Sequence, residues 1–139
     1  MAYKSILIPT DGTRISEDII EFICSIQQVM NAAINVVYVI EVPRNLPLGE
    51  PMPEKVELAQ QAINRVRDIA GKYDAQLNTS IIYARTTEDS IISTAQEFKC
   101  DVIAIAQDNQ KLRIFSNIAS NIYQRAKCSV WLFNNKLQE

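Results

Sequence analysis

The sequence of 139 residues contains no histidine and only three cysteines, Cys24, Cys100 and Cys128. Without histidine, a Ser–His–Asp triad is excluded. The cysteine count is odd and no Cys-x-x-Cys motif occurs, so neither a disulfide framework nor a zinc site is expected. The three thiols lie in core-like segments, and we expect them to be buried, reduced and non-catalytic. The sequence therefore predicts no catalytic residue, no metal ligand and no enzymatic activity.

Strong charge and long apolar runs are also missing. The chain has 14 basic and 16 acidic residues, a formal net charge of −2, which argues against broad nucleic-acid binding. No apolar run approaches the roughly 20 residues of a membrane span, and the apolar run near the N-terminus is too short for a signal peptide. We therefore expect a cytoplasmic protein that neither binds nucleic acid nor inserts into a membrane.

Five short apolar segments alternate with segments of helical periodicity. The apolar segments are nearly continuous, as is typical of parallel strands buried on both faces, and comprise residues 5–9, 34–42, 76–84, 101–106 and 128–133. Apolar residues at helical spacing between them predict helices over residues 16–30, 56–73, 86–98 and 114–123. Four of the five prolines fall within residues 43–53, which predicts an irregular connection.

This alternation predicts an α/β fold with a five-stranded parallel sheet, doubly wound into three α/β/α layers. It occupies a single domain over residues 1–135, followed by a polar tail at 136–139. Right-handed crossovers leave few strand orders, of which orders resembling 2-1-3-4-5 are common. In such a sheet, ligands bind beyond the carboxyl ends of the strands, where the strand order switches.

Asp11 follows the first predicted strand and is a candidate at that position. It can hold a metal, a ribose or an adenine amino group, or it can cap its own turn; both interpretations stay open. A P-loop motif is absent. The third strand ends at Ala84-Arg85 and lacks the acceptor aspartate of a phospho-receiver domain.

Four stretches together resemble the universal stress protein (UspA-like) family. They are Ile6-Leu-Ile-Pro-Thr-Asp-Gly12, Val37-Tyr-Val-Ile-Glu41, residues 84–95 and Cys128-Ser-Val-Trp-Leu-Phe133. The resemblance covers essentially the whole chain, including the proline-rich connection. It implies the strand order 3-2-1-4-5, in the manner of adenine nucleotide alpha hydrolase-like and flavodoxin-like folds.

Glycine is scarce where this resemblance places a phosphate loop. ATP-binding members resemble the pattern G-x2-G-x9-G-[ST] after the fourth strand, in which glycines let backbone N–H groups approach the phosphates. Here the first two glycine positions fall on Ala106 and Asn109, and the final pair falls on Ser116-Asn117. The loop is also about three residues shorter. The chain therefore resembles the branch that lacks the ATP-binding glycines.

The other half of the family's nucleotide site looks retained. Pro9, Thr10, Asp11 and Val39 match family positions that surround the adenine and ribose. With Ala106, Asn109, Ser116 and Asn117, they form the cofactor-binding set that the resemblance implies. Arg85, Lys111 and Arg113 are candidates for contacting an anion; alternatively, they form a solvated basic surface.

Family members commonly dimerise through the last strand, which implies an interface at Val130, Trp131, Leu132 and Phe133. Alternatively, Trp131 packs beneath a helix of its own subunit. The function we expect is that of a non-catalytic stress-response or regulatory protein, a homodimer with unknown protein partners, an eroded nucleotide site and no cofactor. One alternative is an ATP- or AMP-binding member with weak ATPase activity, and another is a regulatory partner of a membrane transporter.

Overall fold

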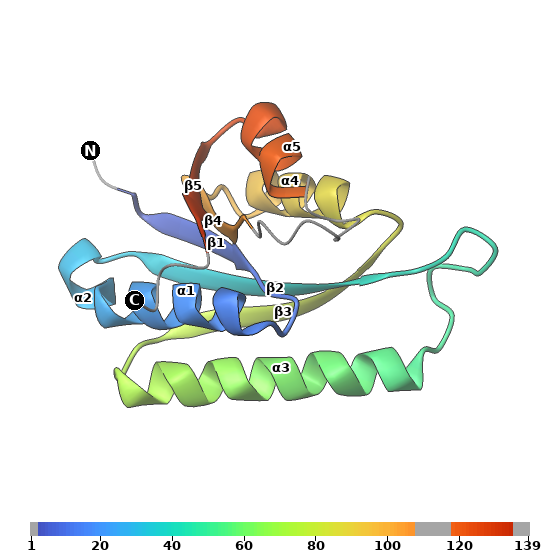
Figure 1. Ribbon diagram of the computed structural model, residues 1–139, viewed down its shortest axis with the longest axis horizontal. Coiled ribbons are helices and arrows are strands. Elements are labelled where there is room, and N and C mark those ends of the chain that lie inside the picture. The colour runs from blue at the N-terminus through green and yellow to red at the C-terminus, as the bar shows by residue number, and fades with distance from the viewer. Residues whose placement is uncertain (1–2, 108–117, 135–139) are drawn as a thin grey trace.

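Five parallel strands form one sheet in the computed structural model, which describes residues 3–107 and 118–134 (Figure 1). The strands are β1 (Ser5–Pro9), β2 (Ala33–Glu41), β3 (Leu77–Ala84), β4 (Val102–Ala106) and β5 (Ser129–Phe133). They lie in the order β3-β2-β1-β4-β5, and every neighbouring pair is parallel. This confirms the predicted five-stranded parallel sheet and the order 3-2-1-4-5.

Helices cover both faces of the sheet, as the nearly continuous apolar strands require. The helices are α1 (Arg14–Ser25), α2 (Gln27–Met30), α3 (Pro53–Lys72), α4 (Thr87–Glu97) and α5 (Ile118–Arg125). Figure 1 shows α1 and α3 on one side of the sheet and α4 and α5 on the other. None of the helices in this part of the chain is both long and apolar enough to cross a membrane.

Successive residues of a strand point to opposite faces of the sheet, and a separate hydrophobic core lies on each face. Ile6 and Ile8 of β1 pack with Ile20 of α1 and Val66 of α3. Leu7, between them, points to the other face and belongs to a second cluster with Ile91 of α4 and Ile122 of α5. Because the central strands β1 and β4 are buried on both faces, the carboxyl ends of the strands are the open position for a ligand.

The helix predicted from Ser16 to Met30 is interrupted. The first helix ends at Ser25, whose hydroxyl donates to the carbonyl of Phe22 at 2.6 Å. Ser side chains that bond to nearby helix carbonyls compete with the backbone ladder. A separate turn, α2, follows and ends at Asn31 in the left-handed conformation, φ 54°. Its Gln27 amide donates to the carbonyl of Gln76 at 2.6 Å, which fastens this turn to the start of β3.

Candidate functional site

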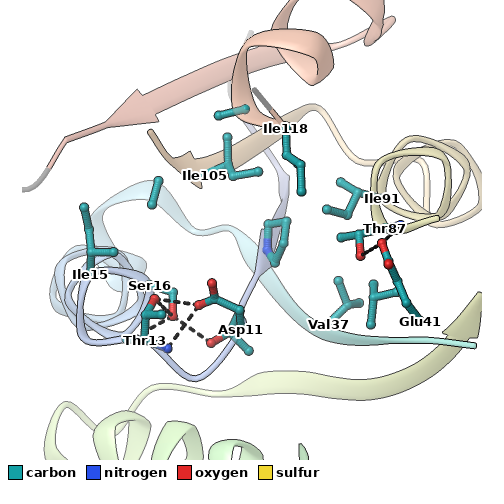
Figure 2. Close-up of a pocket in the computed structure, with 15 residues that line it drawn as sticks. Asp11, Thr13, Ile15, Ser16, Val37, Glu41, Thr87, Ile91, Ile105 and Ile118 are labelled. Atoms are coloured by element: carbon teal, nitrogen blue, oxygen red, sulfur yellow. Dashed lines mark hydrogen bonds between the residues drawn. The ribbon is translucent and has the colours of Figure 1, made fainter. Parts of the chain in front are cut away.

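A cavity of about 270 Å³ opens at the carboxyl ends of β1, β2 and β4 (Figure 2). This is the switch point of the sheet, because the chain leaves β1 toward β2 on one side and reaches β4 on the other. Five residues of the set implied by the family pattern line it: Pro9, Thr10, Asp11, Val39 and Ala106. The other three, Asn109, Ser116 and Asn117, lie outside the described residues, as do Lys111 and Arg113.

Asp11 caps its own loop on one wall of this cavity. One carboxylate oxygen, Oδ1, accepts hydrogen bonds from the backbone N–H of Thr13 at 3.0 Å and from the Thr13 hydroxyl at 2.5 Å. Gly12 between them has φ 83°, a left-handed conformation that glycine adopts without steric cost. The turn interpretation of Asp11 is therefore realised, while its side chain remains exposed at the cavity.

Two buried hydroxyls beneath this loop are fully used within it. The oxygens of Thr10 and Ser16 lie 2.8 Å apart. The hydroxyl of Ser16 donates to the carbonyl of Thr13 at 2.8 Å, and the N–H of Gly12 donates to the Thr10 hydroxyl oxygen at 3.2 Å. The Thr10 hydroxyl thus donates to Ser16. Thr10 therefore shapes the loop and has no hydroxyl proton left for a ligand.

Glu41 and Thr87 form the opposite wall, across the cavity from Asp11 in Figure 2. Oε2 of Glu41 accepts from the backbone N–H of Thr87 at 2.8 Å and from its hydroxyl at 2.7 Å. A helix N-terminus is a ready anion site because its first N–H groups lack helical partners. At α4, this carboxylate already occupies the first turn.

Glu41 lines the cavity, although the sequence analysis did not name it as a candidate site residue. The sequence signal was present, since Glu41 lies next to the end of the predicted strand over residues 34–42 and the predicted helix over residues 86–98 starts at Thr86 and Thr87. Thr86 is indeed the N-cap of α4, and its hydroxyl oxygen accepts from the N–H of Asp89 at 3.4 Å. The register that pairs Glu41 with Ala84 brings the strand end beside this helix start.

An ion-pair cluster joins the start of α4 to the end of α5. Arg125 of α5 contacts Glu88, and its Nη2 lies 2.8 Å from Oδ1 of Asp89. The hydrogen bond from Arg125 lowers the pKa of Asp89 below its ordinary value, and the same contact raises the pKa of Arg125. The guanidinium of Arg125 therefore links the end of α5 to the start of α4.

Arg85, an anion-contact candidate, is not among the described residues that line the cavity. Its Nη1 donates to the carbonyls of Pro43 at 2.6 Å and Leu46 at 2.7 Å, and it also contacts the carbonyl of Val42 at 3.4 Å. These contacts hold the proline-rich connection between β2 and α3. A contact of Arg85 with an anion stays a prediction, and this geometry does not favour it.

The described residues that line the cavity carry a net negative charge. Asp11 and Glu41 are its charged side chains in this part of the chain, and neither lysine nor arginine accompanies them there. The isoleucines at positions 15, 91, 105 and 118 supply apolar walls around them, as Figure 2 shows. The arrangement suits an apolar, flat or neutral group better than a polyanion.

The predicted interface strand β5 is held mainly by its own chain. Trp131 packs edge-to-face against Tyr3, with ring centroids 5.1 Å apart and planes at 79°. Phe133 contacts Phe22 at 6.0 Å. Val130 packs against the core on the α4 and α5 face. Leu132 is 39% exposed. Trp131 therefore packs within its own subunit, and the dimer stays a prediction.

Comparison with known proteins gives one consistent family. The model of the "Universal stress protein family" matches residues 2–134. The universal stress protein MJ0531 of Methanocaldococcus jannaschii is 22% identical over 148 residues, an alignment that covers 99% of this chain and 85% of that protein.

Solved structures agree in fold. A universal stress protein in complex with cAMP superposes with a TM-score of 0.74 at 17% identity, covering 96% of this chain and 98% of the other. The universal stress protein from Archaeoglobus fulgidus in complex with dAMP gives a TM-score of 0.74 at 19% identity, covering 95% and 98%. At these identities the likeness establishes the fold.

Proposed function

Since the chain belongs to the universal stress protein family, we propose that it is a non-catalytic stress-response or regulatory protein that acts as a homodimer. We further propose that its strand-end cavity does not hold ATP tightly. The observation that carries this proposal is the pair of carboxylates, Asp11 and Glu41, on opposite walls of the cavity. The phosphates of ATP would enter a site where like charges repel them.

Two further observations support a non-catalytic role. The Thr10 hydroxyl, a possible nucleophile at the strand end, is hydrogen-bonded into its own loop with Ser16. The cysteines also lie away from this cavity: Cys24 packs in the core under α1, and Cys100 and Cys128 pack on the α4 and α5 face at the other ends of the strands. Nucleophilic catalysis needs a base within hydrogen-bond reach of the nucleophile. In the described part of the chain, neither the Thr10 hydroxyl nor the three cysteine thiols have such a base at this cavity.

The edge position of β5 supports the homodimer. Within the described residues, β4 is the one strand that pairs with β5, so the outer backbone groups of β5 face outward. An edge strand of this kind readily accepts a strand from a second copy. Leu132 adds an apolar side chain to that surface.

We expect Leu132→Asp to convert the dimer to a monomer, because it places a charge in an apolar interface. Analytical ultracentrifugation of the wild type and the variant measures this. The matched control is Leu58→Asp, since Leu58 is 59% exposed on α3 and lies outside β5. A monomeric wild type, or equal behaviour of the two variants, would contradict the proposed interface.

A second candidate function is the binding of an adenine nucleoside monophosphate. All four residues of the family's nucleoside pattern, Pro9, Thr10, Asp11 and Val39, line one cavity, and two proteins of similar fold are known in complex with cAMP and dAMP. Ligand pockets usually measure about 300–1,000 Å³. A cavity of about 270 Å³ therefore suits a small ligand better than a nucleoside triphosphate.

Calorimetry with AMP decides this second function. If it holds, the wild type binds AMP in the micromolar range, and Asp11→Ala weakens binding at least about tenfold, or about 1.4 kcal/mol. Asp68→Ala, an exposed aspartate on α3, is the control and leaves the affinity unchanged. Absent binding would rule the second function out, and the same affinity in all three proteins would show that AMP is not held at Asp11.

A further inference from the structure

A second, smaller cavity of about 140 Å³ holds two of the three thiols. Cys100 and Cys128 both line it, together with Ala95, Ala126 and Lys127. Cys100 precedes β4 and Cys128 precedes β5, so this cavity lies at the amino ends of the strands, whereas the cavity with Asp11 lies at their carboxyl ends. Both cysteines are free thiols and pack against the same hydrophobic cluster.

The strand register brings these two cysteines close together. The backbone N–H of Ser129 donates to the carbonyl of Asp101 at 3.2 Å, and Val102 pairs with Ser129. Cys100 and Cys128 are the residues immediately before the two that this hydrogen bond joins. Neighbouring strands lie about 5 Å apart, and a disulfide needs Cα atoms about 4.4–6.8 Å apart. Continued one residue beyond the strands, this register sets Cys128 opposite Asp101, so Cys128 and Cys100 are offset by one residue. A rise of about 3.3 Å along the strand combined with a strand spacing of about 5 Å gives a Cα separation of about 6 Å, which lies within the range of a disulfide. Both cysteines line the same cavity, so the two thiols lie on the same face of the sheet.

We propose that Cys100 and Cys128 form a reversible intramolecular disulfide when the protein meets a low-molecular-weight disulfide oxidant. The Cys128 thiolate attacks one sulfur of the oxidant, forms a mixed disulfide and releases one thiolate. The Cys100 thiolate then attacks Sγ of Cys128 and releases the second. The two protons lost by the cysteines are taken up by the two released thiolates. The protein is oxidised by two electrons, and the oxidant is reduced to two thiols.

The two thiols have different roles because their exposure differs. Cys128 is half-buried and open to the oxidant, whereas Cys100 is 8% exposed and suits the resolving step. Burial raises the pKa of both thiols, and Asp101 adds to this effect, while the Ser5 hydroxyl, 3.5 Å from Sγ of Cys100, opposes it. Because the thiolate is the reacting form, the reaction is best followed at mildly alkaline pH.

Cys24 provides a matched control within the same chain. It is 3% exposed and lies in the core under α1, on the opposite face of the sheet from Cys100 and Cys128. Burial raises its pKa to about 11. Cys24→Ser therefore removes a thiol without touching the proposed bridge.

The test treats the folded protein with oxidised glutathione at pH 8.5, alkylates the remaining thiols and maps peptides by mass spectrometry. We expect the wild type and Cys24→Ser to lose two thiols and to yield a peptide pair linked through Cys100 and Cys128, which a reductant separates. Cys100→Ser should stop at a glutathione adduct on Cys128. Cys128→Ser should lose thiols at least about tenfold more slowly.

The bridge also has a stability readout. It closes the loop that contains α5, so the oxidised wild type should melt at a higher temperature than the reduced wild type, whereas Cys100→Ser should show no such increase. A folded wild type that keeps three thiols after treatment would overturn the proposal. A bridge that includes Cys24, or equal rates of thiol loss in all three variants, would overturn it too.

Discussion

Replacing Leu7 with alanine is expected to lower the free energy of unfolding by about 2–5 kcal/mol, the usual cost of emptying a buried leucine site. Leu7 is fully buried at the centre of β1 and packs in the core on the α4 and α5 face. Strands on both sides of β1 and the helices above leave little room for the chain to collapse into the space. Urea denaturation followed by circular dichroism measures the change.

The control for Leu7 makes the same substitution at an exposed site. Leu58→Ala, on the outer side of α3, should change the free energy of unfolding by no more than about 0.5 kcal/mol. Similar losses at the two positions would show that the face of the sheet bearing Leu7 is not packed as described. The packing matters for function because β1 carries Pro9, Thr10 and Asp11 to the cavity.

Removing both charges from the cavity is expected to strengthen ATP binding about tenfold or more. The variant is Asp11→Asn with Glu41→Gln, which keeps an acceptor oxygen for Thr13 and for Thr87 while removing the negative charge. A carboxylate and a phosphate charge about 8 Å apart repel by on the order of 1 kcal/mol at an effective dielectric constant of about 40. Two such pairs together correspond to more than tenfold in affinity.

ATP and adenosine should respond differently to the loss of these two charges. The gain in affinity should be large for ATP and absent for adenosine, because only the phosphates are repelled by the carboxylates that are removed. Since both carboxylates are exposed, the gain should shrink as salt is added. An equal gain for adenosine would mean that the substitutions act through the shape of the cavity and not through its charge.

Most of the fold could be predicted from the sequence because the pattern is strong. Parallel strands buried on both faces give continuous apolar runs, and the observed β1 coincides with the predicted residues 5–9. The break after Ser25 was not predictable from periodicity, because Ile26 and Met30 continue the apolar spacing of α1. The hydrogen bond from the Ser25 hydroxyl to the Phe22 carbonyl lies at the end of that helix, and periodicity does not report it.

The candidate site was predictable only in part. Asp11 could be named because topology brings the residues that follow the first strand to the carboxyl end of the sheet. Val39 was named only because it matches a position of the family pattern. The contact of Glu41 with Thr87 depends on the register of β2 against β3, which the sequence does not specify. The role of Arg85 depends on the path of an irregular, proline-rich connection, and its three carbonyl partners could not be foreseen from composition.

The most direct test of the central claim is calorimetry of ATP with the purified wild type, beside the Asp11→Asn/Glu41→Gln variant and Asp11→Ala. We predict millimolar or absent affinity for the wild type and measurably tighter binding by the neutralised variant. Micromolar ATP binding by the wild type that Asp11→Ala abolishes would contradict the claim, because Asp11 would then hold the nucleotide instead of repelling its phosphates.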